Sequence, residues 1–193
     1  MDQLSFYGRC LLLVFLAWWS WRLFAYDYRS GEINGSFMHN ILLAIHEAGH
    51  VIFIPCGEFM TILGGSLFQL LLPLGWAACF VLRQRDNFAA AVTLWWAGQS
   101  FVDLSPYIHD APYRLLPLVG GGGEESHDWG NPLTPLDALG RSPTPARASV
   151  TSGALLMALA PGWAARPPLR ARARCRGGPR APAPRRYSRG GES

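Results

Sequence analysis

The sequence predicts an all-α membrane protein: a bundle of about four transmembrane helices, followed by a disordered basic C-terminal tail. Of the 193 residues, 50% are hydrophobic and only 16% are charged, whereas about a quarter of the residues in a soluble domain are charged. The apolar residues gather in segments that approach the length of a bilayer core, which needs about 20 helical residues. Positive charge, by contrast, gathers after residue 140.

The charge is distributed unevenly along the chain. Residues 1–140 contain 6 arginines and 12 acidic residues, whereas residues 141–193 contain 11 arginines and a single acidic residue. The net charge of +4 therefore comes from the tail, and we expect no nucleic-acid partner for the body of the protein. The four cysteines lack C-x-x-C spacing, which argues against a disulfide framework or a cysteine zinc knuckle.

The first apolar segment runs from Leu4 to Tyr26. Three tryptophans and Tyr26 gather near its end, as aromatic side chains do at the headgroup layer of a bilayer. No small-residue cleavage site follows the apolar core, so we expect an anchor helix rather than a cleaved signal peptide. The polar, turn-forming residues 27–36 predict a loop.

Three further apolar segments follow. The second runs from Phe37 to Ile54 and stops at Pro55, and the third runs from Phe59 to Leu82 without a charge. A fourth extends from Phe88 to about Leu104. The arginines in the link 83–87 favour the cytoplasmic side for that link but do not fix the orientation. We therefore expect an integral, multi-pass protein of the cell membrane.

Residues 131–193 are predicted to form a loop and a disordered tail. Prolines and glycines interrupt any helical pattern from Ser105 onward, and Pro161 argues against a stable span over Val150–Ala165. The arginine-rich residues after Arg166 bury too little apolar surface to offset the entropy of ordering. Such a tail can bind RNA or anionic lipid. Alternatively, the abrupt change to Arg, Ala, Pro and Gly is what translation of a GC-rich gene in the wrong reading frame produces. This alternative predicts a frameshift near residues 131–150.

The second segment contains the motif H-E-x-x-H, in which His46, Glu47 and His50 carry the chemistry. Residues four apart lie on one face of a helix, so both imidazoles can reach one metal ion. Glu47 lies between them in angle and can contact a water on that metal. Two nitrogen ligands, an open position for water and a carboxylate to take its proton are what a zinc hydrolase needs. The alternative is that the histidines form a polar patch against a neighbouring helix.

A third protein ligand is needed to complete such a site. An acid–histidine cluster follows four glycines, and there we expect a solvated loop, with a gate or an accessory metal site as the alternative. The candidates along the chain are Asp103, His109, Asp110, and, in that cluster, Glu124, Glu125, His127 and Asp128.

With this order of motifs, residues 37–112 resemble the site-2 protease family of intramembrane zinc metalloproteases. That family takes its third ligand from the aspartate of N-x-x-P-x-x-x-x-D-G on a later membrane helix. Here the stretch DLSPYIHDA, from Asp103 to Ala111, matches the proline with Pro106 and the ligand with Asp110. Asp replaces the Asn, Ala replaces the Gly, and the gap is one residue shorter. The resemblance implies Asp110 as the third ligand, with Asp103 or His109 as alternatives.

The same resemblance implies a role for Gln69. Family members often carry a G-P-x-x-N-like element on the next helix, with its amide facing the active site. In this chain the element is Gly65-Ser66-Leu67-Phe68-Gln69. Such an amide can hold a substrate carbonyl or stabilise an oxyanion. The alternative is a glutamine that only makes hydrogen bonds between helices.

The resemblance therefore implies an intramembrane zinc metalloprotease whose residues 1–130 form the membrane-embedded domain. His46, His50 and Asp110 would hold Zn²⁺, and Glu47 would act as the base while a zinc-activated water hydrolyses a peptide bond. The partners would be the lipid bilayer and a membrane-protein or peptide substrate. One alternative is a catalytically inactive, metal-binding regulatory membrane protein. Another is a membrane zincin of different lineage, with Glu124 or Glu125 as the third ligand.

Overall fold

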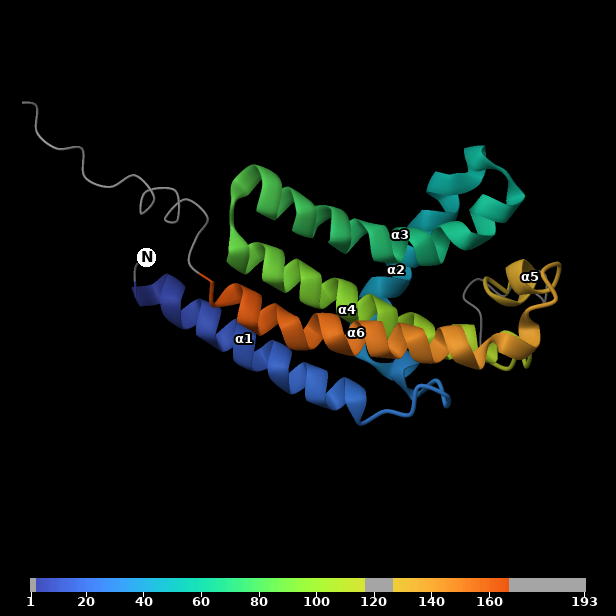
Figure 1. Ribbon diagram of the computed structural model, residues 1–193, viewed down its shortest axis with the longest axis horizontal. Coiled ribbons are helices and arrows are strands. Elements are labelled where there is room, and N and C mark those ends of the chain that lie inside the picture. The colour runs from blue at the N-terminus through green and yellow to red at the C-terminus, as the bar shows by residue number, and fades with distance from the viewer. Residues whose placement is uncertain (1–2, 117–126, 167–193) are drawn as a thin grey trace, which may run out of the picture.

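The structure, a computed structural model, describes residues 3–116 and 127–166, and every regular element in these two ranges is helical. This confirms the predicted all-α class. The long helices α1 (Gln3–Phe24), α3 (Glu58–Cys79), α4 (Asn87–Asp110) and α6 (Pro143–Ala164) run along the long axis of the molecule (Figure 1). The helix α2 (Phe37–Phe53) crosses them. Short turns connect them: η1 (Glu32–Gly35), η2 (Ile54–Cys56), η3 (Phe80–Gln84), α5 (Gly130–Leu133) and η5 (Leu139–Arg141).

Three helices in the described part of the chain are long and apolar enough to cross a membrane. They are Gln3–Phe24, Phe37–Cys56 and Glu58–Gln84, and they correspond to the first three predicted segments. The fourth predicted segment lies within α4, which is not one of these three. The prediction of about four spans is therefore not confirmed.

α4 is the central helix of the bundle. It packs most extensively on α6 and also contacts α1, α2 and α3. Its polar side chains Gln99, Ser100 and Asp103 are almost fully buried. At its start, the carboxylate of Asp86 accepts hydrogen bonds from two backbone N–H groups of the first turn. The polar residues that make α4 less apolar than α3 thus point into the protein.

α4 continues past Ser105, where the sequence analysis predicts a loop. Pro106 has no N–H to donate to the carbonyl of Val102, four residues earlier. The hydroxyl of Ser105 donates a hydrogen bond of 2.6 Å to that same carbonyl, so its acceptor is satisfied and the helix extends to Asp110. The loop prediction was wrong because it treated the proline as a helix end without this compensating bond.

Residues 143–164 form α6, where the sequence analysis also predicts a loop. Two glycines explain why this segment packs as a helix against α4. A Cβ on Gly98 of α4 would lie 2.8 Å from the carbonyl oxygen of Gly153, and a Cβ on Gly153 would lie 2.5 Å from that of Gly98. The glycines that weaken an isolated helix therefore let α4 and α6 approach closely. Pro161 falls in the last turn of α6, where it interrupts little of the helix.

This close fit makes α6 part of the fold and bears on the frameshift hypothesis. A junction near residues 131–150 would place most of α6 after the change of frame. The frameshift near residues 131–150 stays a prediction that the coding DNA would test. The predicted disordered tail, residues 167–193, lies outside the described residues.

α2 and α3 cross where two other glycines meet. A Cβ on Gly49 would overlap the carbonyl oxygen of Gly64, and a Cβ on Gly64 would lie 2.9 Å from that of Gly49. Small residues at a helix crossing allow such backbone contact. The crossing places the next residue of α3, Gly65, directly against the H-E-x-x-H motif.

Candidate metal centre

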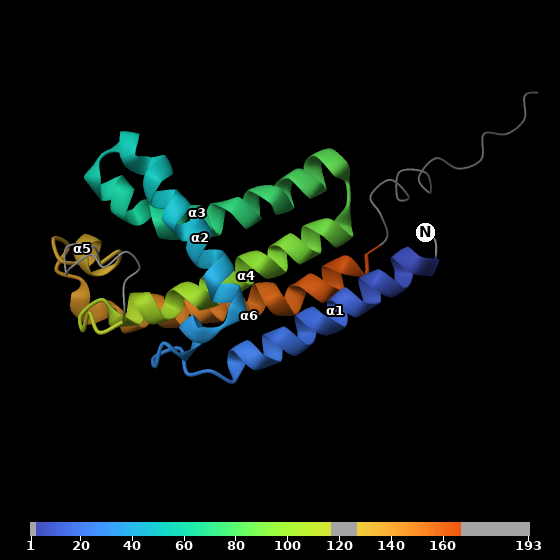
Figure 2. The same cartoon turned by 180° about the vertical axis from the view of Figure 1, so that it is seen from behind.

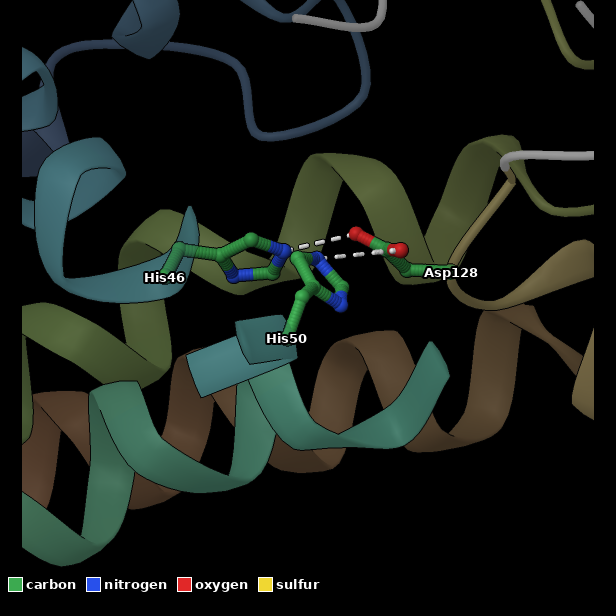
Figure 3. A group of neighbouring side chains, drawn as sticks. All are labelled: His46, His50 and Asp128. Atoms are coloured by element: carbon green, nitrogen blue, oxygen red, sulfur yellow. Dashed lines mark hydrogen bonds and ion pairs between the residues drawn. The ribbon is translucent and has the colours of Figure 1, made fainter. Parts of the chain in front are cut away.

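Three side chains from two distant parts of the chain converge beside α2 (Figure 3). They are His46 and His50 of α2 and Asp128, which precedes α5, and one potential ligand atom from each lies within 4.8 Å of the others. The two carboxylate oxygens of Asp128 lie 2.6 Å from Nε2 of His46 and 3.4 Å from Nε2 of His50. Within residues 3–116 and 127–166, no other group of three such residues is close enough to share a metal ion.

The second ring nitrogen of each histidine is held by an oxygen acceptor. Nδ1 of His46 donates to the amide oxygen of Gln69 at 3.0 Å, and Nδ1 of His50 donates to the carbonyl of Thr61 at 2.8 Å. A neutral imidazole has one N–H, so each Nε2 then points a lone pair at a carboxylate. Lone pairs that face a carboxylate repel it unless a positive charge lies between them. That charge is either a proton on each Nε2 or one cation shared by both rings. Hydrogen bonds of this kind from the outer nitrogen are typical of metal-bound histidines.

Gly65 of α3 provides the space in front of these nitrogens. A Cβ at this position would lie 2.5 Å from Nε2 of both His46 and His50. Glycine is thus the residue that leaves both ligand atoms accessible. Two imidazoles and one carboxylate suit Zn²⁺, and they equally suit other first-row divalent metals. The residues present therefore fit a divalent cation.

A small cavity lies next to the three side chains. Glu47 lines it together with His46 and Asp128, and Gln69 and Tyr107 contribute to its wall. The space open to the centre of a water molecule is about 30 Å³, which is room for one or two waters. The side chain of Glu47 is otherwise exposed, so it can contact both this cavity and a group that approaches from outside.

The neighbours of Asp128 anchor it on both sides. His127 is almost fully buried, and its Nδ1 accepts a hydrogen bond of 2.9 Å from the N–H of Gly130. Its Nε2 lies 3.5 Å from Asp110 of α4, which is closer than a solvent-separated contact but longer than a good hydrogen bond. On the other side, the indole of Trp129 donates to the hydroxyl of Ser66 on α3 at 3.1 Å. Asp128 is therefore held between α4 and α3.

The carboxylate of Asp128 is ionised at neutral pH. Burial alone would raise the pKa of Asp128, but hydrogen bonds from the protonated Nε2 atoms of His46 and His50 and the charge of those rings outweigh burial and lower the pKa to about 2. A carboxylate must be ionised to act as a metal ligand. Asp128 thus has the charge state that a metal site needs.

Asp110, the third ligand implied by the resemblance, has other contacts in the structure. Its carboxylate oxygens accept hydrogen bonds from the backbone N–H groups of Leu115 and Leu116, at 3.1 and 2.9 Å. It does not belong to the group formed by His46 and His50. The gap after Pro106 is one residue shorter than in the family pattern, and one residue turns a helical side chain by about 100°. This rotation gives a physical reason for the different placement of Asp110.

The two alternative ligands also lie outside the group. Asp103 accepts hydrogen bonds of 3.0 Å from Nδ1 of His39 and from the amide nitrogen of Gln69. His109 packs against Tyr28 and Tyr113, with ring centroids 6.0 and 5.9 Å apart. Glu124 and Glu125 fall outside the described residues.

Gln69 orients His46 through a buried chain of hydrogen bonds. The carboxylate of Asp103 only accepts, so Gln69 turns its NH₂ group to Asp103 and its amide oxygen to His46. That oxygen requires the proton of His46 to be on Nδ1, which leaves Nε2 facing Asp128. Both ends of the amide are thus engaged within the protein, and Gln69 is only 2% exposed. This arrangement agrees with the interhelical alternative; the role of Gln69 at an oxyanion stays a prediction.

No protein-family model, curated protein or solved structure matches this chain. The fold and the site define a class nonetheless. In its described residues, the protein is a helical bundle with three helices able to cross a membrane and a His-His-Asp group able to hold a metal ion.

Proposed function

We propose that this protein is an intramembrane zinc metallopeptidase that hydrolyses peptide bonds of membrane-associated substrates, with His46, His50 and Asp128 as its metal ligands. The observation that supports this function best is the convergence of these three side chains next to a cavity that is also lined by Glu47. Two histidines, one carboxylate and a nearby free carboxylate form the usual residue set of a hydrolytic zinc site.

Different residues of the chain have different roles in such a reaction. His46, His50 and Asp128 would hold the zinc ion, which would act there as a Lewis acid toward a water or a carbonyl. Glu47 accepts the proton of that water and passes it to the leaving amine. Gln69 and Thr61 hold the imidazoles in place. Because the cavity has room for water but not for a peptide, the substrate approaches from the open side, where Glu47 is exposed.

The substitution Glu47→Gln tests the mechanism. It removes the base but no metal ligand, so we expect an unchanged zinc content and a loss of cleavage of about 10²- to 10⁴-fold. Zinc is measured by elemental analysis of the full chain in detergent, and cleavage with quenched fluorescent peptides in the same micelles. Glu58→Gln is the matched control, because Glu58 is an exposed acid at the start of α3. Unchanged cleavage in Glu47→Gln contradicts the proposed role.

A metal-binding regulatory protein without catalytic activity is the second candidate function. The small cavity favours it, because room for one or two waters suffices for a structural metal site. In that case the full chain would hold stoichiometric zinc and cleave none of the peptides, and Glu47→Gln would change neither property.

A further inference from the structure

One end of the bundle, remote from the metal centre, is basic. The first turns of α1, the link between α3 and α4, and the last turn of α6 meet there, as the opposite views in Figures 1 and 2 show. The described residues of these three segments contain one acidic residue, Asp86, and four arginines: Arg9, Arg83, Arg85 and Arg166.

Three of these arginines line one cavity of about 250 Å³, measured as the space open to the centre of a water molecule. They are Arg9, Arg85 and Arg166, and each comes from a different segment. None of them forms an ion pair with a carboxylate in the part of the chain that the structure describes. Asp86, which also lines the cavity, accepts hydrogen bonds from the first turn of α4. The cavity therefore has excess positive charge.

Aromatic rings position two of these guanidinium groups. Arg9 lies over the ring of Phe88 at 4.7 Å, and Arg166 lies over that of Trp163 at 5.1 Å. Stacking of this kind holds the plane of a guanidinium group and leaves its N–H donors available in that plane. Arginine donors arranged in this way suit the oxygens of a phosphate group.

We propose that this cavity binds the phosphate of an anionic phospholipid. α1 begins and the α3–η3 span ends beside it, so the cavity lies where headgroups meet a membrane crossed by these helices. Leu82, next to the link, is 75% exposed and offers an apolar contact for an acyl chain. The same donors would accept the phosphate of a soluble ester, so the lipid has to be distinguished from that source. The site shares no residue with the metal centre and does not depend on the proposed peptidase function.

Native mass spectrometry of the full chain in neutral detergent tests the proposal. With equal amounts of phosphatidylglycerol and phosphatidylcholine, we expect preferential retention of phosphatidylglycerol. The triple variant Arg9→Gln, Arg85→Gln, Arg166→Gln should lose this preference. We expect the affinity for phosphatidylglycerol to fall about fivefold for each arginine removed. The matched control removes three positive charges away from the cavity, with the substitutions Arg22→Gln, Arg29→Gln and Arg147→Gln. This variant should keep the preference for phosphatidylglycerol.

Further measurements keep the test decisive. Glycerol phosphate, added without lipid, reports on the soluble source, and binding of it with no retention of phosphatidylglycerol would overturn the lipid assignment. Equal retention of both lipids by the unmodified chain, or an equal loss in the control triple, would also overturn it. Should the triple variant fail to fold, the single change Arg85→Gln at an exposed residue carries the same expectation on a smaller scale.

Discussion

The two parts of the metal centre are built in different ways. His46 and His50 lie four residues apart on one helix, so helical periodicity alone brings them together. Asp128 belongs to a distant segment, and its position depends on the hydrogen bond from Trp129 to Ser66 of α3 and on the 3.5 Å contact between His127 and Asp110 of α4. Local helix geometry thus brings two of the potential ligands together, and tertiary contacts position the third. Each prediction below tests one side of this difference.

The largest effect should come from Asp128 itself. Asp128→Ala removes the one carboxylate among the described residues that is grouped with both histidines. Zinc affinity should therefore fall by more than the roughly 10- to 100-fold loss that changes to residues behind the ligands cause. Asp110→Asn is the comparison variant, because Asp110 accepts hydrogen bonds from backbone N–H groups and reaches the centre only through its 3.5 Å contact with His127, so its effect should be smaller. Zinc stoichiometry and competition with a chelator measure both variants. If Asp110→Asn lost the metal and Asp128→Ala kept it, the third ligand would have to be reassigned.

Gly65→Ala tests the helical side of the centre. The added methyl group would lie 2.5 Å from both Nε2 atoms, so the imidazoles must move, and stoichiometric zinc binding should be lost. Gly75→Ala is the matched control on the same helix, because its Cβ would meet nothing within 4 Å. Elemental analysis and thermal unfolding of the two variants separate loss of metal from loss of fold. Normal zinc content in Gly65→Ala would show that the metal position lies elsewhere.

A smaller effect is expected from the chain of hydrogen bonds behind His46. Asp103→Asn replaces a pure acceptor by an amide, so Gln69 no longer has one required orientation, and zinc affinity should fall by about 10- to 100-fold. Gln99→Leu is the control, because Gln99 is a buried amide on the same helix without a hydrogen-bond partner in the described structure. Chelator titration measures the affinities. Equal affinities in both variants would remove Asp103 from the metal centre.

The smallest effect concerns the anchor of Asp128. Trp129→Phe keeps a ring but removes the hydrogen bond of 3.1 Å to Ser66. A bond of this kind contributes about 0.5–1.5 kcal/mol, so zinc affinity should weaken by a factor of about 2 to 10. Ser66→Ala should cost as much, and the double variant should cost no more than either single one. Fully additive losses would show that the two side chains act independently.

The sequence predicted the local features of this protein well. The bounds of α1, α2 and α3 follow from apolar length, and the pairing of His46 and His50 follows from their spacing. Features that depend on a partner elsewhere were not predictable in this way. Ser105 compensates for Pro106, and Gly98 receives Gly153, only once the helices are formed and packed.

The sequence does not predict Asp128 as the partner of the two histidines, for the same reason. Asp128 is one of the candidates, but the run of glycines before it indicates a solvated loop. The position of Asp128 between His127 and Trp129 argues against a solvated loop. Both neighbours are large side chains with polar atoms, and such side chains can anchor a segment when they are buried. Their partners, Asp110 and Ser66, lie on two different helices that the sequence alone does not bring together.

The separate origins of the three ligands also bear on stability. A cation bound by α2 and the segment before α5 would act as a reversible cross-link between two parts of the chain that are far apart in sequence. Anything that binds only the folded form stabilises that form, by an amount that grows with the logarithm of its concentration. Loss of the metal would therefore lower the stability of the contact between Asp128 and the histidines and leave the glycine crossing of α2 and α3 in place, so the concentration of the ion would set how stable this long-range contact is.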